Sequence, residues 1–281
     1  MNYGPIEQCL KEILGHEAAE HLILVGGAAI LVKRGWLERI QAKTLITAIP
    51  LARSTEDVDF LLSLDLFVRR DGGREIRSML DELKYIPKQE FWQFAKGDIT
   101  VDFLARIPTG ESGVKLNEPR VGAKPSIRLH GHVTPEAFAV EVNPAMIEVV
   151  FGNGPSTEIR KANVAHTYGM LNMKTRAAFD WLQRRLRGEA PKPFSEKHAL
   201  DVYILTASMT FGELEECRAM AANYVDHPIA RAICQEAKNL FSHPNSPGYL
   251  EAQRQVQMEL DHAVFWDGLR EALGIDTVVI P

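Results

Sequence analysis

The sequence predicts an α+β protein, with a mixed sheet and flanking helices first and an α-helical region after it. Short apolar runs bounded by Gly, Pro and charged residues follow one another up to about residue 150, as strands between turns do. Apolar positions recur at helical spacing after about residue 160. The chain has 281 residues, of which 46% are hydrophobic, enough for two modest domains. We therefore expect domains at 1–160 and 161–281.

The first elements surround a pair of glycines. Apolar residues at helical spacing predict an amphipathic helix over 5–20. The run 21–25 is short and apolar and ends at Gly26-Gly27, which indicates a buried strand entering a tight turn. A helix is expected to resume at 28–35.

The next elements alternate between strand and helix. We expect a strand at 58–64, a surface helix at 72–83, and a hairpin of 91–95 with 99–105 around Lys-Gly-Asp. The composition of 119–150 is β-like, and Asn-Gly-Pro at 153–155 marks a turn. Short strands are expected there at 126–130, 138–142 and 146–150, and helices later at 164–186 and 195–206.

Bulk properties exclude some classes of protein. The net charge of −5 argues against a protein that coats nucleic acid over its whole surface, although a local basic patch stays possible. No apolar run reaches the ~18–20 residues that span a bilayer, and no signal peptide is apparent, so no membrane partner is expected. Cys9, Cys217 and Cys234 are odd in number and far apart, which favours free thiols in a reducing cytoplasm.

The most informative motif is the pair Asp57 and Asp59 at the start of an apolar run. Residues i and i+2 of a strand point to the same face, so both carboxylates would project together. Like charges at that distance raise each other's pKa unless a cation lies between them. Mg²⁺ prefers such oxygen ligands together with substrate phosphates. A solvated strand end is the alternative for an isolated Asp-x-Asp.

Two further features accompany this pair. Glycines at 26 and 27, between a strand and a helix, would let a phosphate approach backbone N–H groups at a helix N-terminus, although a tight turn without a ligand has the same pattern. Asp102 lies inside the apolar run 99–104, where a buried carboxylate needs a partner, either a cation or a salt bridge. Three carboxylates on adjacent strands can hold two Mg²⁺ ions ~3.5–4 Å apart.

This combination resembles the DNA polymerase β-like nucleotidyltransferase superfamily. The matching signature is Gly26-Gly27 after a strand, Asp57-Val-Asp59 on the next strand, and Asp102 on a later one. The form Arg53-x-Thr55-x-Asp57-Val-Asp59 is most similar to the nucleotidyltransferase toxins of abortive-infection toxin–antitoxin systems. The resemblance implies a nucleotidyltransferase-type mixed sheet, with Asp57, Asp59 and Asp102 as metal ligands and catalytic residues.

The same resemblance extends to the helical part. Lys174 and Asp201 match the lysine and aspartate of the helical segment in those toxins, where the lysine faces the triphosphate and the aspartate orients it. Lys174 is thereby expected to bind phosphate and take part in catalysis, together with Asp201. An exposed helix cation is the alternative for Lys174. Gly26, Gly27, Arg53 and Thr55 complete the expected nucleotide-binding set, although Arg53 could instead pair with Glu56.

The expected activity is Mg²⁺-dependent transfer of a nucleotide from a nucleoside triphosphate to an acceptor hydroxyl. The acceptor would be a tRNA 3′ end or a protein, and the resemblance implies an antitoxin as a possible partner. Two alternatives stay open from the sequence. One is an aminoglycoside-type antibiotic adenylyltransferase, and the other is a nucleotide-binding regulator without turnover.

Overall fold

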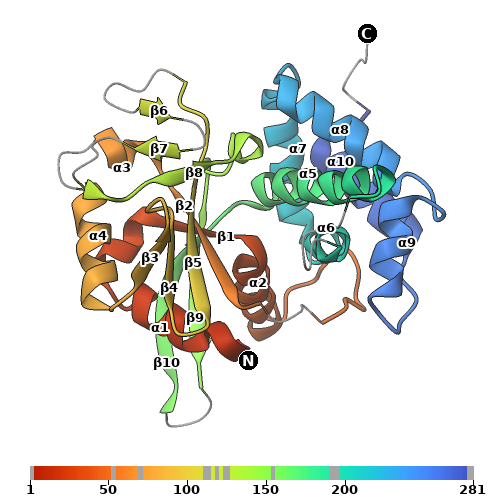
Figure 1. Cartoon of the computed structure of the whole chain (residues 1–281). Helices are drawn as coiled ribbons and strands as arrows, with labels where there is room; N and C mark the ends of the chain where they lie inside the picture. Colours follow the sequence, from red (N-terminus) through yellow and green to blue (C-terminus); the bar gives the residue numbers. More distant parts are fainter. Residues whose placement is uncertain are drawn as a thin grey trace. The chain divides into compact units, whose positions relative to one another are not determined.

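The computed structural model describes residues 3–51, 55–68, 72–109, 115–117, 120–122, 127–152, 156–189 and 196–276. The chain divides into two compact units: Met1–Glu38 with Arg53–His166, and Arg39–Ala52 with Thr167–Pro281. The first is built around a mixed sheet with flanking helices, and the second is helical (Figure 1). The α+β class predicted from the sequence is therefore confirmed. Among the described residues, no helix is long and apolar enough to span a membrane.

The first unit holds one sheet of ten strands among the described residues, in the order β6-β7-β8-β5-β2-β1-β10-β9, with β3 and β4 attached through β5. The pairs β1–β10, β2–β5 and β5–β8 are parallel, and the other pairs are antiparallel. The strands are β1 (Leu22–Val25), β2 (Asp57–Leu62), β3 (Ile86–Gln89), β4 (Gln93–Lys96), β5 (Ile99–Ala105), β6 (Lys115–Asn117), β7 (Arg120–Gly122), β8 (Gly131–Val133), β9 (Ala145–Phe151) and β10 (Glu158–Val164).

Helices in the first unit connect these strands. They are η1 (Gly4–Ile6), α1 (Glu7–Leu14), η2 (Glu17–His21), α2 (Gly26–Arg39), α3 (Leu64–Val68), α4 (Gly72–Glu82) and η4 (Pro135–Ala137). The core behind β2 and β5 is aromatic: Phe60 and Phe103 stack at 6.3 Å between ring centroids, and Phe94 meets Phe103 edge-on at 5.7 Å. All three side chains are fully buried, so one face of these strands is fixed by packing.

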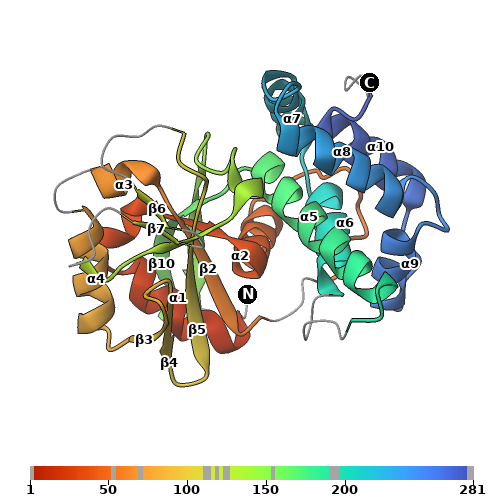
Figure 2. The same ribbon diagram turned by 45° about the horizontal axis from the view of Figure 1, so that its top comes forward.

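The second unit is a group of helices (Figure 2), and it has an aromatic core of its own. Phe265 packs against Tyr203 at 5.0 Å and against Phe241 at 5.5 Å between ring centroids. Segment 39–52 joins this unit through backbone hydrogen bonds from Leu45 and Ile46 to Met209 and Ala207. The helices are α5 (Thr167–Leu186), α6 (Lys197–Ala207), α7 (Phe211–Asn223), α8 (Pro228–Phe241), α9 (Pro247–Arg254) and α10 (His262–Leu273).

Three predictions of local structure are wrong. The stretch 138–142 is not a strand, because a turn that follows η4 occupies it and the Glu141 carboxylate accepts a hydrogen bond from the Leu64 backbone N–H at 3.1 Å. Residues 127–130 are not a strand either, and β8 begins only at Gly131. The expected helix over 5–20 ends at Leu14, after which Gly15 and His16 lead into η2. The predicted turn at 153–155 lies outside the described residues.

Candidate functional site

The two acidic strands lie next to each other in parallel register. Asp59 of β2 is the Cα partner of Asp102 on β5, and Asp57 is the partner of Thr100. Parallel partners project to the same face, so the carboxylates of Asp59 and Asp102 share one face of the sheet. Val58 and Phe103 face the other way and are fully buried, whereas Asp59 and Asp102 are half-buried. The structure thus places β2 and β5, the two strands that carry the predicted acidic residues, side by side.

The glycine turn lies directly beside Asp59. Val25, the last residue of β1, is the antiparallel partner of Asp59, and Gly26 follows it at the start of α2. Gly26 has a φ of +69°, and a Cβ atom there would come within 2.8 Å of Asp59 Cγ and closer still to its Oδ2. Only glycine avoids both the backbone strain and this overlap. The first turn of α2, where backbone N–H groups have no acceptor within the helix, therefore begins against the acidic face.

Asp102 has an unusual protonation equilibrium. Burial raises its pKa to about 7, and the nearby Asp59 and Asp57 charges also raise that pKa, while a hydrogen bond from Gln93 opposes them. Gln93 Nε2 donates to Asp102 Oδ1 at 2.8 Å from the neighbouring strand β4. A carboxyl of this kind exchanges its proton near neutral pH. The role of Gln93 was missed from the sequence because it depends on the β4–β5 register.

Asp57 and Thr55 have local partners. The Asp57 carboxylate accepts a hydrogen bond from the Thr100 hydroxyl. The Thr55 hydroxyl donates to the Asp57 carbonyl at 3.1 Å and accepts from the Asp57 backbone N–H at 3.3 Å. The Thr55 side chain therefore orients the start of β2, and any contact with a nucleotide stays a prediction. Arg53 lies outside the described residues.

The donor atoms at this face suit Mg²⁺ in chemical type. Among the described residues, no set of three or more His, Cys, Asp or Glu side chains is arranged to hold a metal ion. Mg²⁺ does not require such a set, because it commonly takes one or two carboxylates and completes its shell with phosphate oxygens and water. Asp59 and Asp102 are the pair that offers this, and a cation beside them would relieve the repulsion that adds to the effect of burial on the Asp102 pKa.

The two residues predicted from the helical part also meet. In the second unit, Lys174 Nζ of α5 lies 2.8 Å from Asp201 Oδ2 of α6, and both residues are buried. His198 Nδ1 lies 3.8 Å from the same Asp201 oxygen. Burial lowers the pKa of His198 to about 4, although the nearby Asp201 carboxylate acts in the opposite direction. Asp201 thus pairs with Lys174, whose contact with phosphate stays a prediction, while His198 stays neutral at physiological pH.

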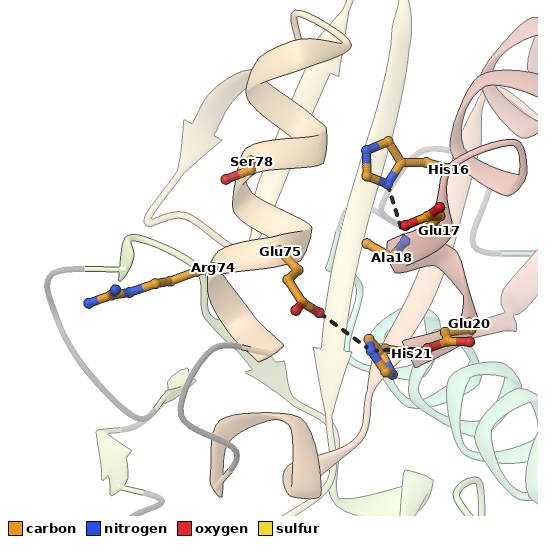
Figure 3. A pocket seen from close by; sticks show the side chains of 8 residues that line it. All are labelled: His16, Glu17, Ala18, Glu20, His21, Arg74, Glu75 and Ser78. Atoms are coloured by element: carbon orange, nitrogen blue, oxygen red, sulfur yellow. Dashed lines mark hydrogen bonds and ion pairs between the residues drawn. The ribbon is translucent and has the colours of Figure 1, made fainter.

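A pocket that the sequence did not predict lies at the other end of β1 from the glycines. It has a volume of about 420 Å³ and lies between η2 and α4 (Figure 3). His21 Nε2 lies 3.5 Å from Glu20 Oε1 and 3.6 Å from Glu75 Oε2. No sequence signal pointed to it, because its lining comes from segments more than fifty residues apart that carry ordinary polar residues. The lining residues are His16, Glu17, Ala18, Glu20, His21, Arg74, Glu75 and Ser78.

Comparison of the chain with known proteins found no match. No family model matches the chain, and no curated protein or solved structure matches it. The resemblance to nucleotidyltransferases therefore stays a prediction that depends on the motif residues and on the geometry of the acidic face.

Proposed function

We propose that this protein is a Mg²⁺-dependent nucleotidyltransferase. The single observation that carries the proposal is the register of β2 and β5, which pairs Asp59 with Asp102 on one face beside the turn at Gly26. Carboxylates at neighbouring strands next to an open helix N-terminus suit a nucleoside triphosphate with its divalent ion. The triphosphate would lie between that turn and the acids, with Gly27 offering only backbone donors.

The proposed reaction transfers a nucleotide to a hydroxyl. The acceptor oxygen forms a bond to the α-phosphorus, the bond between that phosphorus and the α–β bridging oxygen breaks, and pyrophosphate leaves. Bound Mg²⁺ would neutralise developing charge on the phosphate oxygens. Asp57, Asp59 and Asp102 are the proposed metal ligands, and Asp59 and Asp102 lie closest to each other by register.

Asp102 is the proposed acceptor of the hydroxyl proton. Without a cation, burial and the neighbouring acids raise its pKa to about 7. Bound Mg²⁺ would lower that pKa and keep the carboxylate ionised, so that it could accept a proton. Gln93 would hold its carboxylate in place through the 2.8 Å hydrogen bond. Lys174 is paired with Asp201 within the second unit, and a contact of this lysine with phosphate stays a prediction.

The test is transfer of label from nucleoside triphosphates. The whole chain is incubated with each α-³²P-labelled triphosphate, Mg²⁺, total tRNA and cell extract. Label in RNA supports a tRNA acceptor, and label in protein supports a protein acceptor. Transfer to an aminoglycoside instead would identify the antibiotic-modifying class. Triphosphate binding without transfer under any condition would favour the non-catalytic regulator and contradict the proposal.

A matched pair of variants controls this assay. Asp59→Asn keeps the shape of the side chain and removes its charge, so transfer is expected to fall by at least ~100-fold, as for loss of a group that stabilises the transition state. Asp98→Asn changes an exposed carboxyl in the β4–β5 turn by the same chemistry and is expected to leave transfer unchanged. Equal activity of the two variants would refute the assigned role of Asp59.

A further inference from the structure

The β3–β4 turn has a strained backbone that presents two aromatic side chains. Glu90 and Phe91 have φ values of +37° and +61°, in a turn closed by a hydrogen bond from the Trp92 N–H to the Gln89 carbonyl at 2.9 Å. Residues with side chains rarely adopt this conformation, and glycine or asparagine is usual at such turn positions. Strain of this kind persists only where the surrounding structure enforces it, and it concentrates at ligand sites.

A second segment enforces the strained turn. His130 donates its backbone N–H to the Phe91 carbonyl at 2.9 Å, and its Nδ1 lies 2.7 Å from the Glu90 carbonyl oxygen. Arg128 is itself in the left-handed region, with a φ of +54°, and its guanidinium carbon lies 5.8 Å from the centroid of the Phe91 ring. The segment 128–130, about forty residues further along the chain, therefore holds the aromatic turn at 90–91 in a fixed conformation.

The rings form two pairs that remain partly accessible. The Trp92 indole lies over the His132 imidazole, with 4.8 Å between centroids and 34° between planes, and His130 meets Phe91 edge-on at 6.1 Å. All four side chains are half-buried, namely those of Phe91, Trp92, His130 and His132. Phe94, two residues after Trp92, is instead fully buried. We call Phe91, Trp92, Arg128, His130 and His132 the aromatic cluster.

The aromatic cluster is joined by hydrogen bonds to the strand that carries Asp102. The Trp92 carbonyl accepts a hydrogen bond from the Phe103 N–H at 2.7 Å, and Phe103 follows Asp102. The next residue, Gln93, donates its side-chain amide to Asp102 at 2.8 Å. A ligand stacked on Trp92 would therefore be positioned by the same residues that position the Asp102 carboxylate.

We propose that the aromatic cluster binds a nucleobase of a nucleotide held beside Asp102. This inference deepens the proposed nucleotidyl transfer and rests on it. A partly exposed indole fixed by backbone hydrogen bonds offers a preorganised plane for base stacking, and Arg128 adds a cation next to it. The base could belong to the incoming triphosphate or to the acceptor end of an RNA, and the two sources are separated by experiment.

The experiment measures binding without Mg²⁺, so that no transfer occurs. One arm compares ATP with ribose 5-triphosphate by calorimetry. The other compares a fluorescent pentaribonucleotide with the same molecule lacking its 3′-terminal base, by anisotropy. The base-bearing probe of one arm is expected to bind about 5- to 100-fold more tightly than its base-free counterpart, the range found for stacking of one base.

Variants test whether Trp92 causes the tighter binding of the base-bearing probe, which we call the base advantage. Trp92→Leu keeps an apolar side chain but removes the ring, and it is expected to abolish the advantage, whereas Trp92→Phe retains part of it. Phe211→Ala removes an aromatic ring that is 69% exposed on α7 and is expected to leave the advantage unchanged. A preference for ATP assigns the base to the incoming nucleotide, and a preference confined to the RNA assigns it to the acceptor.

Two results would overturn the inference: equal binding of base-bearing and base-free probes in both arms, or an advantage that survives in Trp92→Leu. The proposed function can fail separately. Tighter binding of the base-bearing probe without any label transfer would support the base site and contradict the proposed enzymatic activity. Conversely, label transfer with an unchanged KM for both substrates in Trp92→Leu would support the enzymatic activity and contradict the base site.

Discussion

Replacement of Gly26 by alanine tests how closely the glycine turn and the acidic face are packed. A Cβ atom at this position would lie 2.8 Å from Asp59 Cγ, closer to Oδ2, and 3.1 Å from Asp59 Cβ. Gly97 provides a matched control in the same unit. It has a similar φ, +61° against +69° for Gly26, and a Cβ atom there would meet nothing within 4 Å. Both substitutions place alanine in the left-handed region, but only the one at the buried Gly26 also meets a neighbouring side chain.

The expected magnitudes follow from that difference. Gly97→Ala carries only the penalty of a left-handed alanine, about 1–2 kcal/mol. Gly26→Ala carries the same penalty and must also displace the Asp59 carboxylate, which adds on the order of 1–3 kcal/mol, as for overpacking of a core site. Gly26→Ala is therefore expected to destabilise the protein by about 2–5 kcal/mol.

Urea unfolding measures both effects, with stability compared at unchanged m value. Adding Asp59→Ala to Gly26→Ala removes the overlapping carboxylate and leaves only the 3.1 Å approach of the Asp59 Cβ, so the double variant is expected to recover most of the extra loss. Equal destabilisation by Gly26→Ala and Gly97→Ala, or no recovery in the double variant, would refute the close contact between the turn and Asp59.

Two further predictions concern buried charges. The pKa of Asp102 is raised to about 7, above its unfolded value near 3.9, so its contribution to stability is present below about pH 4 and is lost as the pH rises through 7. The loss is at most about 4 kcal/mol, and Asp102→Asn is expected to flatten the dependence of the urea midpoint on pH between about pH 4 and 7; an unchanged slope would contradict it. Lys174→Met leaves the Asp201 carboxylate buried without its 2.8 Å partner and is expected to destabilise the protein by about 3–5 kcal/mol, whereas Lys174→Met with Asp201→Leu recovers most of that loss in urea unfolding. Failure of the second substitution to rescue the first would show that the pair is not coupled.

The acidic face could be predicted from the sequence because it depends on local periodicity. Alternation along a strand places Asp57 and Asp59 on one face, and an acid inside the apolar run 99–104 must emerge on one side. The pairing of Asp59 with Asp102, by contrast, depends on strand order and register, which no local pattern encodes. For the same reason, neither the Gln93 hydrogen bond nor the contact between Gly26 and Asp59 could be predicted.

The missed elements have a common physical cause. Residues 138–142 carry apolar side chains at strand spacing, but Ala139 and Val140 are buried by turn packing, and Glu141 bonds the start of α3. The strand β10 (Glu158–Val164) is half charged or polar and gave little apolar signal, although it pairs with β1 in parallel and with β9 along its whole length. Contacts with residues distant in the sequence decide the conformation of both segments, and a short stretch of sequence does not contain those residues.

Manganese binding tests the central claim most directly, because Mn²⁺ takes the oxygen ligands of Mg²⁺ and is detected by electron paramagnetic resonance. The chain is titrated with Mn²⁺ in the presence of a non-hydrolysable nucleoside triphosphate, and the spectrum of free Mn²⁺ reports what is not bound. If Asp59 and Asp102 hold the ion, binding beyond that of the triphosphate alone will appear, vanish in Asp59→Asn and persist in Asp98→Asn. Equal Mn²⁺ binding by the two variants would contradict the assignment of this face as the metal and nucleotide site.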